Sequence, residues 1–169
     1  SIRTFDQDKF LIMTTKNGII KKSKLEDYSR PRTNGIIAIN LKGDDELISV
    51  QTSSGKDEIL ISTRMAQAVR FNEEKVRSVG RNSMGVKGIT LKPKDSVVSS
   101  EVIKNDNVKI LTVTENGFGK RTDISKYRLT SRGGKGVTTL KVTEKTGEIV
   151  NAFQTENEDQ IILLSSEGK

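Results

Sequence analysis

The chain has 169 residues, a formal net charge of +7, no cysteine and no histidine. These absences exclude disulfides and thiolate metal sites, and they remove the commonest general base of enzymes. Apolar residues make up 33% of the sequence and aromatic residues 4%, so we expect an aliphatic core. Because no stretch approaches the roughly 18 apolar residues of a membrane span and no basic-then-apolar leader precedes the first repeat, we expect a cytoplasmic protein.

The chain repeats one unit of roughly 50 residues, a period typical of stacked or radially arranged units. The copies open with similar segments, at residues 10–18, 58–66, 109–117 and 160–168. Within a single domain, we place blade-like repeats at about 9–56, 57–106 and 107–157, with the start of a further repeat at 158–169.

Each unit is predicted to contain four short strands, because runs rich in β-branched residues alternate with turn signals. In the first unit we expect strands at Phe10–Thr14, Ile19–Lys22, Ile36–Leu41 and Glu46–Gln51. In the second we expect them at Ile59–Ser62, Ala68–Phe71, Gly88–Leu91 and Val97–Val102, with Ala66 in place of the turn glycine. In the third we expect them at Ile110–Thr114, Phe118–Arg121, Val137–Val142 and Glu148–Phe153. Four strands per unit indicate an all-β, propeller-like array of four-stranded antiparallel blades.

A long polar connector links the second and third strands of each unit, at residues 23–35, 72–85 and 122–136. Each connector ends in glycine beside basic residues, as in Ser131-Arg-Gly-Gly-Lys-Gly136. Glycine permits close backbone approach, so such a loop could bind a phosphate, but glycine-rich turns also occur in all-β repeats for purely structural reasons. Tyr28 and Tyr127 occupy equivalent places in their connectors, and we expect them to pack against the blade.

Positive charge recurs in phase with the repeat. Residues 19–42, 68–94 and 118–141 hold 20 of the 29 Lys and Arg residues but 5 of the 22 Asp and Glu residues. Charge that recurs with a structural unit should form a stripe on one face, and the backbone of DNA or RNA is the obvious partner. The candidate DNA-binding residues are the cations of the connector ends and second strands: Arg32, Arg81, Lys87, Arg132, Lys135, Lys21, Lys22, Arg70, Lys120 and Arg121. We assign no catalytic residue, metal ligand or cofactor.

Several segments resemble the C-terminal domain of the A subunit of bacterial DNA gyrase. The similarity runs through nearly the whole chain and is closest at residues 116–122, 131–137, 141–144, 43–48, 76–77 and 85–89, and at Gly147. The resemblance implies a β-pinwheel, whose four-stranded blades exchange a strand with their neighbours and whose basic perimeter binds and bends DNA. It also implies a partial ring, an internal portion covering roughly the third to fifth of six blades.

The same resemblance implies the setting of the whole enzyme. DNA gyrase is an ATP-hydrolysing type II topoisomerase of the bacterial cytoplasm, associated with the nucleoid. It is a heterotetramer of two A and two B subunits, and ATP and Mg²⁺ belong to other domains and to the B subunits. DNA wrapped on the blades is presented for strand passage, which introduces negative supercoils.

Two alternatives stay open. The family's glutamine-led basic box is present only as the degenerate Thr130-Ser-Arg-Gly-Gly-Lys-Gly136, so the corresponding domain of topoisomerase IV remains possible. A propeller-like protein-interaction scaffold, whose basic stripe meets an acidic protein, is the alternative from a different class.

Overall fold

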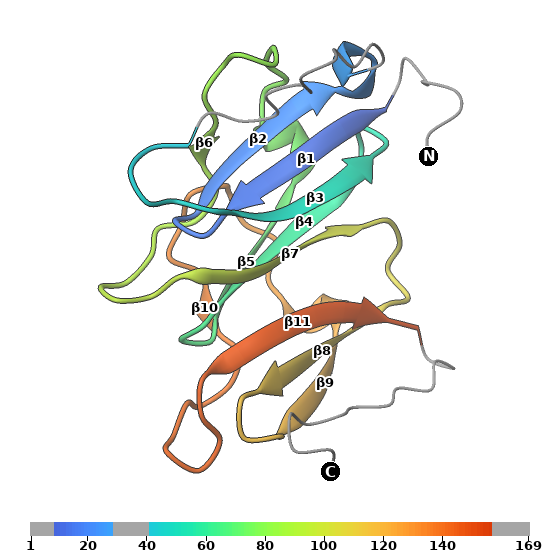
Figure 1. The fold of residues 1–169 in the computed structure, drawn as a ribbon. Coiled ribbons are helices and arrows are strands. Elements are labelled where there is room, and N and C mark those ends of the chain that lie inside the picture. The colour runs from blue at the N-terminus through green and yellow to red at the C-terminus, as the bar shows by residue number, and fades with distance from the viewer. Residues whose placement is uncertain (1–8, 29–40, 157–169) are drawn as a thin grey trace.

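A computed structural model of the chain describes residues 9–28 and 41–156, and they form an all-β array of three antiparallel sheets with three short 3₁₀ turns. The sheets follow one another along the molecule in chain order, and within the described residues they do not close into a ring (Figure 1). No helix in this part of the chain is long and apolar enough to cross a membrane.

The sheets share one strand arrangement. The first, from one edge to the other, contains β3 (Leu47–Ser53), β1 (Phe10–Thr15), β2 (Ile19–Lys24) and β6 (Val86–Lys87). The second contains β7 (Val97–Ile103), β4 (Glu58–Thr63), β5 (Gln67–Asn72) and β10 (Val137–Thr138). The third contains β11 (Ile149–Thr155), β8 (Lys109–Thr114) and β9 (Gly119–Asp123). The 3₁₀ turns η1 (Leu25–Tyr28), η2 (Glu73–Lys75) and η3 (Ile124–Lys126) follow β2, β5 and β9.

The first two strands of each unit form a tight hairpin whose turn requires a positive φ. Gly18 and Gly117 have φ of 91° and 86°, and Ala66 takes the same role with φ of 65°. The predicted first, second and fourth strands of all three units are confirmed within two residues at each end. Local turn chemistry and β-branched content therefore suffice to define these hairpins and the strand that follows them.

The outer strands β6 and β10 pair with the preceding unit. Val86–Lys87 pairs with Ile19–Ile20 of β2, and Val137–Thr138 pairs with Gln67–Ala68 of β5. The strand exchange expected from the family resemblance is thus observed for both of these strands.

The predicted bounds Gly88–Leu91 are wrong at both ends, and Val137–Val142 is right at its start but wrong at its end. β6 and β10 each stop pairing at the first residue of the partner strand. The next residue of each already hydrogen-bonds to the hairpin turn of the preceding unit. Gly88 N donates to Gly18 O, and Thr139 N donates to Ala66 O. The third strand predicted in the first unit, Ile36–Leu41, lies almost entirely outside the described residues, as does the start of a further repeat at 158–169.

Aliphatic side chains fill the spaces between neighbouring sheets, as the composition predicts. On β4, Ile59 and Ile61 belong to one buried cluster and Leu60 to the other, because successive side chains of a strand point to opposite faces. Tyr127, 4% exposed, packs in the second cluster, which confirms its predicted packing role. Burial raises the pKa of its hydroxyl, so the neutral form is favoured.

Gly136 lets β10 approach β5, and this provides a test of the strand exchange. Its φ is 80°, and a Cβ at this position would overlap the Ala68 carbonyl oxygen. We expect Gly136→Ala to lower the free energy of unfolding by about 2 kcal/mol or more, measured by urea denaturation. Gly134→Ala in the same loop is the matched control, because a Cβ there would meet the Ser131 oxygen at 4.0 Å, an ordinary contact distance. Equal effects of the two substitutions would contradict the observed packing of β10.

Candidate nucleic-acid interface

One position of the second strand carries a cation in all three units. The register pairs Lys22 with Ile12, Arg70 with Leu60 and Arg121 with Leu111, which makes the three cations equivalent. The sequence predicts that all three lie on a DNA-binding perimeter. In the first two units the structure gives this position a different role.

Lys22 is buried against the second unit. Its Nζ lies 3.1 Å from Glu73 Oε1 and 4.4 Å from the centre of the Phe10 ring, and the Lys22 and Glu73 side chains are 7% and 0% exposed. Glu73 also accepts hydrogen bonds from Ser53 Oγ and Asp57 N, both at 2.8 Å. The carboxylate is therefore well satisfied, and Lys22 forms a buried ion pair between two successive units.

Arg70 makes the equivalent connection to the third unit. Its guanidinium pairs with Glu58 Oε1 at 2.6 Å, and its Nη1 donates to the carbonyl oxygens of Ile124 and Tyr127. Lys22 Nζ approaches the corresponding carbonyl, that of Glu73, at 3.4 Å. Both cations thus hold the 3₁₀ turn of the following unit and are better described as inter-unit clamps than as surface groups.

Lys21 is also buried, with 1% of its surface exposed. Its Nζ donates to the Arg81 carbonyl oxygen, and desolvation lowers the pKa of its ammonium group. The expectation that Lys21 and Lys22 lie on the perimeter is therefore corrected. The connector of the second unit binds both ammonium groups, that of Lys21 through the Arg81 carbonyl and that of Lys22 through Glu73, so neither belongs to the exposed interface.

The corresponding cations of the third unit, on β9, lie at the surface of the described part of the chain. Lys120 and Arg121 are exposed; Lys120 Nζ lies 3.3 Å from Thr139 O, and Arg121 donates to Thr155 Oγ1 and to the Glu156 carbonyl. Of the predicted connector residues, Lys87 and Lys135 are exposed, Arg81 and Arg132 are half-buried, and Arg32 lies outside the described residues. Part of the predicted set of DNA-binding cations is therefore exposed in the structure.

Four exposed cations of the second and third connectors were missed. Lys75 and Lys126 end the 3₁₀ turns η2 and η3, and Arg77 and Arg128 follow two residues later in each connector. The parallel bridges Lys22–Ser78 and Arg70–Leu129 show that these positions are equivalent in the two units. Alignment of the connectors from their first residues, instead of from their terminal glycines, would have revealed this repetition.

The connector of the third unit surrounds a surface hollow of about 540 Å³. Its lining includes Arg128, Arg132 and Lys135, together with the backbone of Gly133 and Gly134. Three cations and no carboxylate line this hollow, so it favours an anion such as a phosphate group.

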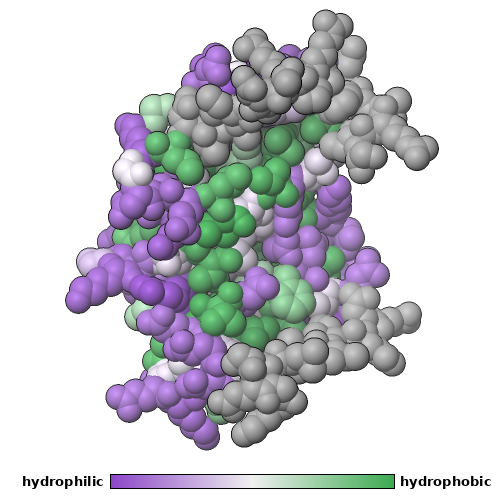
Figure 2. Space-filling model, in the orientation of Figure 1, coloured by the Kyte–Doolittle hydropathy of each residue, from purple (hydrophilic) through white to green (hydrophobic). Residues whose placement is uncertain are grey.

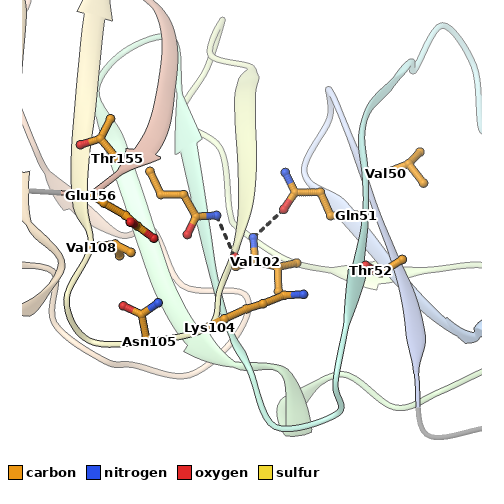
Figure 3. Close-up of a pocket in the computed structure, with 10 residues that line it drawn as sticks. Val50, Gln51, Thr52, Val102, Lys104, Asn105, Val108, Thr155 and Glu156 are labelled. Atoms are coloured by element: carbon orange, nitrogen blue, oxygen red, sulfur yellow. Dashed lines mark hydrogen bonds between the residues drawn. The ribbon is translucent and has the colours of Figure 1, made fainter. Parts of the chain in front are cut away.

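The opposite edges of the sheets carry a different surface. Gln51 on β3 and Gln154 on β11 bind the backbone N and O of Val102 on β7, at 2.7 and 2.9 Å (Figure 3). The hollow beside them, of about 910 Å³, is lined by Lys104 but also by Glu156. On the face shown in Figure 2, hydrophobic residues form a central band between hydrophilic margins. Val50 on β3 and Val150 on β11 are half exposed. We call this side of the described residues the inner side; in its hollow the charge of Lys104 is opposed by that of Glu156.

Residues 9–28 and 41–156 contain no group of three or more Asp, Glu, His or Cys side chains that could hold a metal ion.

Serial sheets, of which the first two take their fourth strand from the next unit, define the β-pinwheel class of propeller-like repeat proteins. The chain belongs to the family described as DNA gyrase C-terminal domain, beta-propeller, which matches residues 9–54, 57–104 and 109–156. It is 44% identical over 163 residues to the DNA gyrase A subunits of Staphylococcus epidermidis and Staphylococcus aureus, covering 96% of this chain. The chain spans 18% of the length of these relatives.

Two solved structures have closely similar folds. The C-terminal domain of DNA topoisomerase IV aligns with a TM-score of 0.92 and 28% identity, covering 99% of this chain and 53% of that one. The DNA gyrase A C-terminal domain aligns with a TM-score of 0.84 and 30% identity, covering 94% of this chain and 53% of that one. Each solved chain is thus about half covered.

The buried pair of Lys22 and Glu73 provides a second test. Lys22→Met leaves the Glu73 carboxylate buried without its counter-charge, and we expect a loss of about 3 kcal/mol in the free energy of unfolding. Lys24→Met, at an exposed lysine of the same strand, is the matched control and should change stability by less than about 0.5 kcal/mol. Urea denaturation measures both, and equal effects would contradict the clamp.

Proposed function

We propose that this chain binds duplex DNA through the exposed cations of its connectors, as part of the DNA-wrapping domain of a DNA gyrase A subunit. The observation that carries the proposal is the repetition of Lys75 and Arg77 at Lys126 and Arg128, one unit further along the chain. Cations spaced by a structural repeat can follow a phosphate backbone, which is itself a periodic line of charge. Family membership and 44% identity to gyrase A subunits support the same function.

The mechanism is electrostatic bending without sequence readout. Bending 20–30 base pairs by 40–90° costs on the order of 1–6 kcal/mol, so contacts on several units must offset it. Lysine and arginine side chains on successive connectors provide such contacts, and the inter-unit clamps hold them in a fixed relation. Because phosphates carry no sequence information, binding should vary little between DNA sequences.

In the whole enzyme, these blades would set the path of the DNA while other domains perform the chemistry. The proposed assembly contains two A and two B subunits in the bacterial cytoplasm, associated with the nucleoid. ATP and Mg²⁺ would be bound by other domains and by the B subunits. Wrapping with a fixed hand would then direct ATP-driven strand passage toward negative supercoils.

The corresponding domain of topoisomerase IV is the second candidate, because the fold match to that domain has a TM-score of 0.92. Both candidates bind DNA in this proposal, and a fixed handedness of wrapping is what the gyrase assignment adds. Nicked plasmid, closed by ligase in the presence of the chain, reports that geometry as a change in linking number. A consistent change of one sign favours the gyrase assignment, and no change favours topoisomerase IV.

Salt dependence tests the electrostatic mechanism. If about six phosphates are engaged, log affinity should fall against log salt concentration with a slope near −5, measured by fluorescence anisotropy on duplex DNA. Replacing Lys75, Arg77, Lys126 and Arg128 by Gln should make the slope shallower by roughly 0.9 for each phosphate interaction removed. Lys104→Gln, on the inner side, is the control and should leave the slope unchanged. An affinity independent of salt would refute the mechanism.

DNA curvature separates wrapping from a protein-interaction scaffold. A wrapping surface should bind a small DNA minicircle more tightly than a linear duplex of the same length and sequence, because the minicircle is already bent. A competition mobility-shift assay measures the ratio. Equal affinity for the two forms would favour a docking scaffold that meets DNA only through its charge.

A further inference from the structure

The half-buried guanidinium of Arg132 joins two backbone segments of the preceding unit. Its Nε donates to the carbonyl oxygen of Lys75 at 3.1 Å, and its Nη1 donates to that of Lys87 at 2.8 Å. Lys75 ends the turn η2 and Lys87 ends the strand β6, so the two acceptors come from opposite ends of one connector. Arg132 therefore fixes both ends of the second unit's connector relative to the third unit.

The loop that carries Arg132 is itself held on the second unit. Gly133 N donates to Gly88 O at 2.8 Å, and Thr90 N donates to Gly134 O at 2.9 Å. The Thr90 hydroxyl donates to Gly133 O at 2.6 Å. These bonds seat the loop on residues 88–90, and they orient the Arg132 side chain toward the carbonyls that it binds.

Four exposed cations lie in the segments that this arrangement holds. Lys75 and Lys87 belong to the second unit, whereas Arg128 and Lys135 belong to the third and line the same hollow as Arg132. The carbonyl partners of Arg132 are neutral, so its positive charge is not cancelled and still adds to the local potential. Two units thus contribute to one cationic surface, with Arg132 between their contributions.

We propose that Arg132 is a positioning residue for a composite phosphate-binding surface formed by Lys75 and Lys87 of one unit and Arg128 and Lys135 of the next. This inference rests on the proposed DNA binding and refines it, since it gives Arg132 a role different from that of a simple phosphate contact. The planar guanidinium donates in two fixed directions, which the single ammonium group of a lysine does not reproduce.

The first experiment compares Arg132→Lys and Arg132→Gln in the anisotropy titrations against salt. If Arg132 mainly supplies charge to a phosphate, Arg132→Lys should bind DNA like the original chain. If it positions the composite surface, both substitutions should weaken binding by a similar factor, roughly five- to tenfold, equivalent to about 1–1.4 kcal/mol. An Arg132→Lys affinity within about twofold of the original would overturn the inference. Lys104→Gln is the control for a general loss of charge.

A second comparison separates positioning from a change in stability. Lys75→Gln with Lys87→Gln should make the salt slope shallower by about 1.8 in the original chain, because two phosphate interactions are removed, but by clearly less in the Arg132→Gln background. Equal changes in the two backgrounds would overturn the inference. Since Lys75 and Lys87 are exposed, their replacement should not impair folding.

The outcomes distinguish this inference from the proposed function. Failure of the original chain to bind DNA would refute the proposed function itself. Salt-dependent binding by the original chain, with no slope change from the Lys75 and Lys87 substitutions, would refute only the composite surface, even if the Arg132 variants do not fold.

Discussion

The docking of each connector on the preceding unit is the constraint on which the rest of the structure depends. β6 and β10 complete the outer edges of the first two sheets, and their pairing brings the connector over the second strand of the sheet. The cation that the second strand carries at the position of Lys22 and Arg70 then contacts backbone carbonyls instead of solvent. Lys22 and Arg70 accordingly bind the 3₁₀ turns of their neighbours, and glycine is needed where β10 passes Ala68.

The same docking divides the positive charge into two groups. Cations on covered strands, such as Lys21 and Lys22, stabilise the joint between units, whereas cations that follow the 3₁₀ turns, such as Arg77 and Arg128, remain exposed at equivalent positions. Bonded joints and repeated exposed charges are the two properties that the proposed DNA-bending surface requires, because the spacing of the charges must withstand the force of the bent duplex. The connectors provide both properties.

The sequence predicts most of the fold but only part of the candidate interface. Hairpins such as Phe10–Lys24 depend on local turn chemistry and are predictable, and strand exchange follows from the family resemblance. The ends of β6 and β10 are not predictable in this way, since the length of a partner strand in another unit sets them. Lys21 and Lys120 occupy equivalent positions in the sequence, yet one is buried and the other exposed, because only the first has a described connector docked beside it.

Lysine acetylation footprinting with and without duplex DNA, quantified by mass spectrometry, tests the central claim most directly. The account predicts that Lys75, Lys126 and Lys135 react in the free chain and are protected by DNA, that Lys104 reacts equally in both states, and that Lys21 and Lys22 react slowly throughout. Protection of Lys104 without protection of the connector lysines, or rapid reaction of Lys21 and Lys22, would contradict it.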